Sequence, residues 1–139
     1  MTVRNGSCGC GDLKYSVEGE PVNSVFCYCK ECQIHTGSDK WFGVWYPKET
    51  FKITSGNPSI YARKGMSGKD MNHLFCANCG VMVAAEVTAG NFYSVGVSTL
   101  DEFDGLAPAM AIYTASAPSW AVYPEGVPKF DTLPPGMGG

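Results

Sequence analysis

The chain has 139 residues, a formal net charge of −3 and a hydrophobic share of 45%, with a pI near 5.3. This length suffices for one ordinary domain with a buried core. The acidic balance argues against nucleic acid or an anionic membrane as the main partner, because both attract a basic surface. No apolar run approaches transmembrane length, and residues 1–10 lack the apolar stretch of a signal peptide. We therefore expect a cytoplasmic protein.

Short alternating or apolar segments follow one another along the chain and predict an all-β domain of short antiparallel strands. Turn residues such as Gly, Pro, Asn and Asp separate these segments. No amphipathic helix of ordinary length is evident, and residues 33–40 are polar and turn-like. We expect one domain over residues 1–125 and an extended Pro/Gly-rich tail over residues 126–139. The predicted strands cover residues 13–17, 22–26, 41–46, 51–54, 59–63, 81–87, 92–97 and 109–113.

The cysteines are the strongest chemical signal, because all of them lie in three tight clusters. An odd number of thiols, in an expected reducing compartment and in C-x-C pairs too close for an easy bridge, argues against a disulfide framework. Buried core cysteines would be scattered rather than clustered beside Gly and Asn. Zinc binding is the interpretation that we favour. The three clusters are Cys8 with Cys10, Cys27 with Cys29 and Cys32, and Cys76 with Cys79.

The outer pairs are predicted to share one zinc ion. Cys76 and Cys79, followed by Gly80, form a typical knuckle that supplies two thiolates from one tight turn. A structural zinc needs four ligands, and Cys8 with Cys10 would supply the other two. The metal would then tie the N-terminal strand to the middle of the chain and contribute its binding free energy to folding.

The central triplet of Cys27, Cys29 and Cys32 offers three ligands, the number typical of a zinc site with an open position for water or a substrate thiol. Zinc lowers the pKa of a bound thiol enough to deprotonate it. Two alternatives stay open at this point. His35, three residues after Cys32, would close the triplet as a structural site. The triplet and the outer pairs could also exchange partners.

The order of the cysteines, with Gly37-Ser38 after the triplet and Phe75 before the knuckle, resembles the glutathione-dependent formaldehyde-activating enzyme family. Centromere protein V belongs to the same superfamily. Further matches are the opening at residues 6–11, Leu100-Asp101 and the Pro-Trp segment at residues 117–120. The resemblance covers residues 6–120, most of the chain.

This resemblance implies a β-tent fold, two Zn²⁺ ions and glutathione as cosubstrate, with the glutathione sulfur as fourth ligand of the catalytic zinc. The family reaction joins glutathione and formaldehyde into S-hydroxymethylglutathione. The chain would thus be a carbon–sulfur lyase or synthase acting on a small-molecule thiol and an electrophile, or on a thioether adduct. The implied structural ligands are Cys8, Cys10, Cys76 and Cys79, and the implied catalytic ligands are Cys27, Cys29 and Cys32.

Two family histidines are replaced here, because Tyr28 stands inside the triplet and Ala111 precedes the late strand. Imidazoles are common proton-transfer groups. The chain's two histidines, His35 and His73, are expected to be structural, and Lys30 is expected to be solvated. The competing function is a non-catalytic zinc-stabilised binding module whose second site is closed by His35. A thioredoxin-like redox role is disfavoured, because neither C-x-x-C pair opens a helix in a βαβ pattern.

Overall fold

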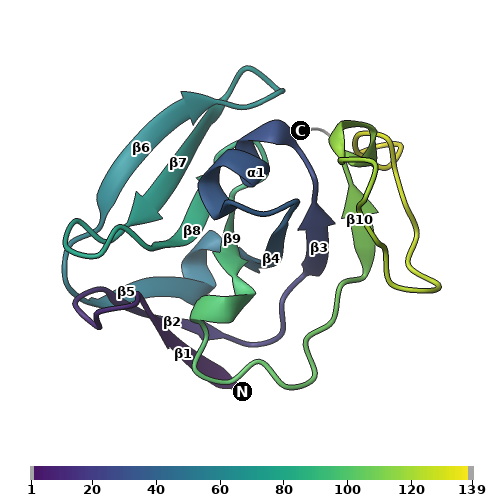
Figure 1. Cartoon of the computed structure of the whole chain (residues 1–139). Helices are drawn as coiled ribbons and strands as arrows, with labels where there is room; N and C mark the ends of the chain where they lie inside the picture. The colour runs from purple at the N-terminus through teal and green to yellow at the C-terminus, as the bar shows by residue number, and fades with distance from the viewer. Residues whose placement is uncertain (1, 138–139) are drawn as a thin grey trace.

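A computed structural model of the chain describes residues 2–137. Within that range the chain forms ten strands, one α-helix and three short 3₁₀ helices (Figure 1). No helix among these residues has the length and apolar character that a membrane crossing requires. The elements are β1 Val3–Ser7, β2 Lys14–Glu18, β3 Asn23–Cys27, α1 Lys30–Thr36, β4 Trp41–Pro47, η1 Lys48–Thr50, β5 Phe51–Ser55, β6 Ser59–Lys64, β7 Asp70–Phe75, β8 Met82–Val87, β9 Phe92–Gly96, η2 Val97–Thr99, β10 Met110–Ile112 and η3 Thr114–Ser116.

The strands build two sheets, which confirms the predicted all-β class. A three-stranded sheet has the order β1-β2-β5, and a seven-stranded sheet has the order β10-β3-β4-β9-β8-β7-β6. All pairs are antiparallel except β10 with β3, which run parallel. The main hydrophobic core contains side chains of both sheets, among them Tyr15, Val17, Val44, Tyr46 and Val95.

The two faces of the large sheet have different surroundings, since one packs in the main core and the other lines a cavity. Successive side chains of a strand point to opposite faces. On β4, Val44 and Tyr46 are fully buried in the main core. Trp41 and Trp45 therefore project from the other face, where they line a cavity. This division places the cavity on the face of the seven-stranded sheet that lies opposite the main core.

Three elements differ from the sequence-based expectation, and one of them is β7, a strand for which no segment was predicted. Strand β1 lies in a polar, Gly-rich segment without strand propensity, and it forms through backbone pairing with β2 at the edge of the small sheet. Helix α1 occupies the first part of the segment that was expected to be turn-like. Cys29 caps its N-terminus by accepting a hydrogen bond from the backbone N–H of Cys32. Gly37 ends the helix in the left-handed conformation that favours glycine.

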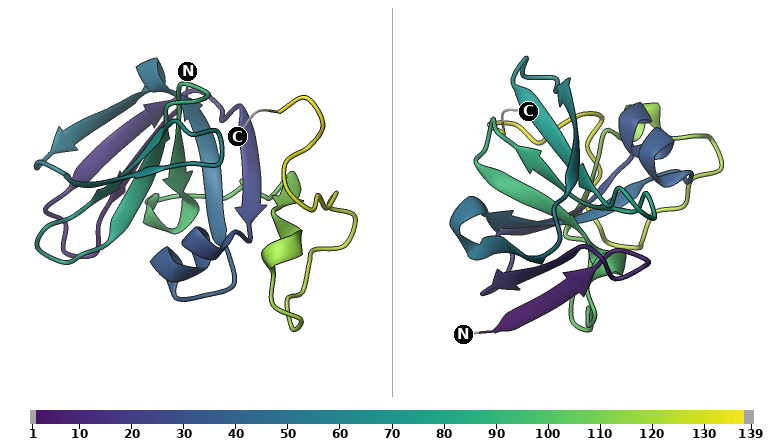
Figure 2. Two further views of the ribbon diagram at one scale, coloured as in Figure 1. Left: turned by 90° about the horizontal axis from the view of Figure 1, so that it is seen from above. Right: turned by 90° about the vertical axis from the view of Figure 1, so that its left-hand side faces the viewer.

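The C-terminal segment is held against β10 rather than extending freely. The N–H of Ala111 donates to the carbonyl of Pro128 at 2.9 Å, and the N–H of Phe130 returns a bond to Ala111 at 2.9 Å. Phe130 and Leu133 also pack against a second apolar cluster around Val25. The segment lies on the side of the molecule away from the β1–β2 hairpin (Figure 2). The boundary at residue 125 stays a prediction.

Candidate metal centres and active site

Four cysteine sulfurs gather where the two sheets meet. Cys8 and Cys10 lie in the turn between β1 and β2, and Cys76 and Cys79 lie in the turn between β7 and β8. Their Sγ atoms all lie within 4.8 Å of one another, close enough to hold a metal ion. A metal ion here would join the small sheet to the large one, which explains why two segments far apart in sequence converge.

Backbone and side-chain N–H groups point at these sulfurs. The backbone N–H of Leu13 donates to Sγ of Cys8 at 3.3 Å, and the amide of Asn78 donates to Sγ of Cys10 at 3.3 Å. Burial opposes ionisation of Cys8, but the hydrogen bonds from Leu13, Cys76 and Cys10 outweigh it and lower the pKa of this thiol to about 6. Such donors stabilise thiolates, the form in which cysteine binds metal.

The central triplet forms where β3 gives way to α1. Cys27 ends β3, Cys29 caps α1, and Cys32 lies in the first turn of that helix. The three Sγ atoms lie within 4.8 Å of one another. The sulfurs of Cys29 and Cys32 are 3.2 Å apart, and the backbone N–H of Cys32 donates to the Cys29 sulfur at 3.3 Å. Cys29, the residue that caps the helix, is therefore also a member of a second group of potential metal ligands.

Negative charge in the triplet concentrates on Cys29. Hydrogen bonds from the thiols of Cys27 and Cys32 hold the pKa of Cys29 well below its ordinary value, and the positive charge of Arg63 adds to the effect. The hydrogen bonds that Cys27 and Cys32 make with the other thiols of the triplet raise the pKa of each of these two cysteines. The lowered pKa of Cys29 favours its thiolate, the form in which cysteine binds a metal ion.

The triplet opens onto a cavity of about 530 Å³. The free face of the large sheet forms one side of this cavity, and residues of α1 and of the C-terminal segment line it as well. Trp41 and Trp45 of β4 line the cavity. Trp120 is 67% exposed and does not line it.

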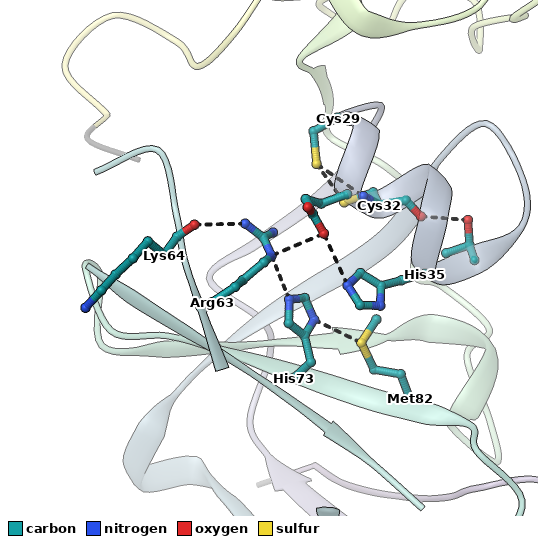
Figure 3. Close-up of polar contacts among 9 residues, drawn as sticks. Cys29, Cys32, His35, Arg63, Lys64, His73 and Met82 are labelled. Atoms are coloured by element: carbon teal, nitrogen blue, oxygen red, sulfur yellow. Dashed lines mark hydrogen bonds and ion pairs between the residues drawn. The ribbon is translucent and has the colours of Figure 1, made fainter. Parts of the chain in front are cut away.

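Arg63 and His73 both line the cavity, and Figure 3 shows their side chains beside Cys29, Cys32 and His35. Arg63 Nε donates to His73 Nε2 at 2.9 Å, and Arg63 Nη1 donates to the carbonyl of Lys64 at 3.3 Å. Burial, followed by the nearby charges of His35 and Arg63, lowers the pKa of His73 to about 4. His73 is therefore neutral and carries its proton on Nδ1, which faces Met82 Sδ at 3.1 Å. Both ring nitrogens are in use.

His35 stands beside His73 rather than completing the triplet. The two rings stack with centroids 4.2 Å apart. His35 Nε2 lies 3.5 Å from a carboxylate oxygen of Glu31, is buried and makes no hydrogen bond. Within residues 2–137, the group of potential metal ligands around Cys29 contains only the three cysteines. The geometry thus gives no support to closure of the site by His35.

Sequence reasoning missed the charged groups around the triplet. Arg63 lies 31 residues after Cys32 along the chain, and only the position of β6 brings it to the cavity. Its Nε is 3.6 Å from Glu31, a residue of α1 that spacing alone did not single out. Lys30 lines the cavity as well, whereas Lys40 pairs with Asp39 at 3.0 Å. Charge-bearing residues with no motif of their own give no sequence signal.

Comparison with known proteins identifies the fold and the family. No curated protein is significantly similar to the chain. The crystal structure of a Rhodobacter sphaeroides protein matches with a TM-score of 0.57 and 22% identity, over 75% of this chain and 91% of that one. At this identity the likeness establishes the fold alone. The family model described as glutathione-dependent formaldehyde-activating enzyme matches residues 3–116. The chain therefore belongs to the glutathione-dependent formaldehyde-activating enzyme family.

Proposed function

We propose that the protein is a zinc-dependent carbon–sulfur lyase or synthase that joins a thiol such as glutathione to an aldehyde, or cleaves the adduct. One observation carries the proposal. Three cysteine sulfurs within 4.8 Å of one another open onto a cavity of about 530 Å³, and no histidine or carboxylate of residues 2–137 joins the group. Three protein ligands and one open position are typical of a catalytic zinc.

The proposal divides the metals between the two cysteine groups. Cys8, Cys10, Cys76 and Cys79 would hold a structural zinc, since four thiolates form a closed set. Cys27, Cys29 and Cys32 would hold the catalytic one. A zinc ion bound there would lower the pKa of a substrate thiol and keep it as the nucleophilic thiolate.

Arg63 has the position of an electrostatic stabiliser. Its side chain is 16% exposed, and its positive charge acts on the Cys29 sulfur. Anionic sulfur in a partly dehydrated cavity needs such a counter-charge, because charges interact more strongly there than in bulk water. Bonds to His73 and to the Lys64 carbonyl hold the guanidinium in place. We assign it the role of stabilising the substrate thiolate and the oxyanion of the adduct.

His35 is the candidate proton-transfer group. His73 uses both ring nitrogens, whereas His35 Nε2 is unpartnered apart from the Glu31 carboxylate at 3.5 Å. Both His35 and Glu31 line the cavity. The pair would accept the proton of the incoming thiol and return it to the carbonyl oxygen.

The proposal includes a cytoplasmic location and small-molecule partners, with no role for nucleic acid or a membrane. The seven cysteines are free thiols, which a reducing compartment would preserve.

Zinc content and zinc K-edge absorption, measured before and after adding glutathione, test the proposal. We expect one zinc for each of the two cysteine groups, with one zinc gaining a sulfur ligand when glutathione is added. The Cys29→Ser variant should lose that response while keeping the structural zinc. Two zinc ions with no response to any thiol would instead favour the non-catalytic binding module.

A further inference from the structure

The cavity beside the triplet is far larger and more apolar than formaldehyde requires. Its volume of about 530 Å³ falls within the range of sites for drug-sized ligands, roughly 300–1,000 Å³. Its lining surface is mainly apolar, with methionine, tryptophan and aliphatic side chains among the residues that form it. Glutathione is a charged, polar tripeptide and formaldehyde adds only one carbon to its sulfur, so neither part of that adduct matches this apolar surface.

Trp41, one of the aromatic residues that line the cavity, neighbours the first cysteine of the triplet across two paired strands. Trp41 on β4 is the register partner of Cys27 on β3. Directly opposed residues of neighbouring strands place their side chains on the same face, about 5 Å apart. The Cys27 thiol and the Trp41 side chain therefore project from the same face of the sheet, and Trp45 and Tyr113 pack against the cluster that contains Cys27.

The sheet is built to hold the Trp41 ring in place. Gly43 and Gly96 are register partners on β4 and β9. A Cβ at Gly43 would lie 2.6 Å from Trp41 Nε1, and a Cβ at Gly96 would lie 2.7 Å from Trp41 Cη2. The indole N–H donates to Ser94 Oγ at 3.0 Å. Two opposed glycines and one hydrogen bond thus seat the ring against the sheet.

The apolar wall continues beyond Trp41. Trp45 stacks on Phe92 with ring centroids 4.3 Å apart, and both residues line the cavity. Ala85 on β8 is the register partner of Ser94 and keeps the space above the sheet open, because its side chain ends at Cβ. The surface suits a flat or elongated apolar group.

We infer that the carbon partner of the thiol is an aldehyde with an apolar, preferentially aromatic, group rather than formaldehyde. This inference rests on the proposed function and names its substrate class. The thiol sulfur would form a C–S bond with the carbonyl carbon as the S–H bond and the C=O π bond break. The thiol proton would then form an O–H bond with the carbonyl oxygen. The addition is redox-neutral and needs no further reactant.

A ladder of unreactive glutathione thioethers tests the inference on the zinc-loaded protein. S-methyl-, S-propyl-, S-butyl-, S-hexyl- and S-benzylglutathione differ only in the group that would enter the cavity. Each buried methylene contributes about 0.8 kcal/mol, so Kd should fall about fourfold per added methylene. S-benzylglutathione should bind at least about 100-fold more tightly than the S-methyl compound. A Kd that does not change along the ladder would overturn the inference.

A variant that fills part of the cavity tests whether the group on the sulfur binds there. Ala85→Leu places three more carbons in the cavity and should weaken S-benzylglutathione binding about tenfold while leaving S-methylglutathione nearly unchanged. Ala62→Leu, at an exposed position of β6 outside the cavity, is the matched control. Val87→Phe, at the half-buried register partner of Phe92, serves if Ala85→Leu fails to fold. Equal weakening of both thioethers would count against the assigned cavity.

Turnover separates this inference from the proposed function. With glutathione as thiol, benzaldehyde should give a kcat/KM at least about tenfold above that of formaldehyde. A preference for formaldehyde would leave the proposed function standing and overturn the inference. A steep thioether ladder without turnover of any aldehyde would overturn the proposed function and leave the apolar ligand preference standing.

Discussion

Arg63 on β6 and His73 on β7 are joined by a hydrogen bond of 2.9 Å from Nε to Nε2 (Figure 3). The bond fixes the guanidinium beside Cys29 and, at the same time, fixes the neutral tautomer of the imidazole. A positive charge and a thiol cluster from opposite ends of the fold thereby form one site. Each partner of this bond can be tested separately.

Replacing Arg63 with Gln should cut turnover and weaken metal binding at the triplet. The variant keeps hydrogen-bonding capacity but removes the positive charge that acts on the Cys29 sulfur. Residues that support metal ligands typically contribute 10- to 100-fold to affinity or activity, and we expect a loss of about that size. A competitive zinc titration together with kcat/KM measures it.

Lys64→Gln is the control for this change. Lys64 is the neighbouring cation, but its side chain is exposed and pairs with Asp70 at 2.6 Å. Arg63 contacts only its backbone carbonyl. The control should retain turnover and zinc affinity. A similar loss in both variants would point to a general effect of surface charge instead.

His73 should make folding stability sensitive to acid. Its folded-state pKa is lowered to about 4 from an ordinary value near 6.5, mainly by burial. Between these values the unfolded chain binds more protons than the folded one, so stability falls as the pH drops from 6.5 towards 4. At 1.36 kcal/mol per pKa unit, the loss attributable to His73 is on the order of 3 kcal/mol.

Urea unfolding at several pH values in this window provides the measurement. His73→Gln keeps an acceptor for Arg63 but does not titrate, so its stability should decline less steeply than that of the wild type. Acid also protonates metal-bound thiols, and comparison of the two proteins at each pH removes that shared contribution. Parallel curves would mean that His73 contributes nothing to the acid sensitivity.

The two cysteine groups should respond differently to alanine. Cys76→Ala breaks the group that joins the two sheets. Structural zinc typically contributes about 10–16 kcal/mol to small domains, comparable with or above the whole stability of about 5–15 kcal/mol. That variant should be unfolded by circular dichroism. Cys29→Ala should lose turnover yet remain folded, because the triplet involves only β3 and α1. Equal unfolding of both would refute this division of roles.

Much of the strand framework is predictable because its signals are local. Alternating segments such as residues 13–17 and 51–54 mark β2 and β5, and Pro47 ends β4 near the expected position. Strand β1 escapes prediction because its pairing with β2 depends on backbone hydrogen bonds rather than on apolar side chains. Helix α1 escapes because it is seven residues long and is capped by a cysteine, a residue that spacing assigns to metal binding.

Within the candidate site, the clustered cysteines could likewise be predicted from local sequence, whereas contacts that depend on the fold could not. Ligand number and spacing allow the grouping of Cys8 and Cys10 with Cys76 and Cys79 but also an exchange of partners with the triplet, and in the structure these four sulfurs lie together. The approach of Arg63 to Cys29 depends on how the β6–β7 hairpin folds over the sheet, which no short motif encodes. The seating of Trp41 by Gly43 and Gly96 likewise depends on strand register.

The Trp41 seat can be tested by a double-mutant cycle with Gly96. In Gly96→Ala the new methyl would lie 2.7 Å from Trp41 Cη2, and the three nearest atoms all belong to that ring. Overpacking of this kind costs about 1–3 kcal/mol. Trp41→Leu removes the ring, so Gly96→Ala should be nearly neutral in that background. Additive losses of stability across the cycle would contradict the contact.

The C-terminal segment should contribute to stability and to closure of the cavity. Phe130 is half-buried against the cluster around Val25, and Leu133 both packs there and lines the cavity. Phe130→Ala should therefore lower the free energy of unfolding by about 1–2 kcal/mol, less than the 3–5 kcal/mol of a fully buried phenylalanine. Trp120→Ala, at an aromatic side chain that is 67% exposed, should change it by less than about 0.5 kcal/mol. Because the segment covers part of the cavity, Phe130→Ala should also weaken binding of S-benzylglutathione, and unchanged stability and binding would show that the tail is dispensable.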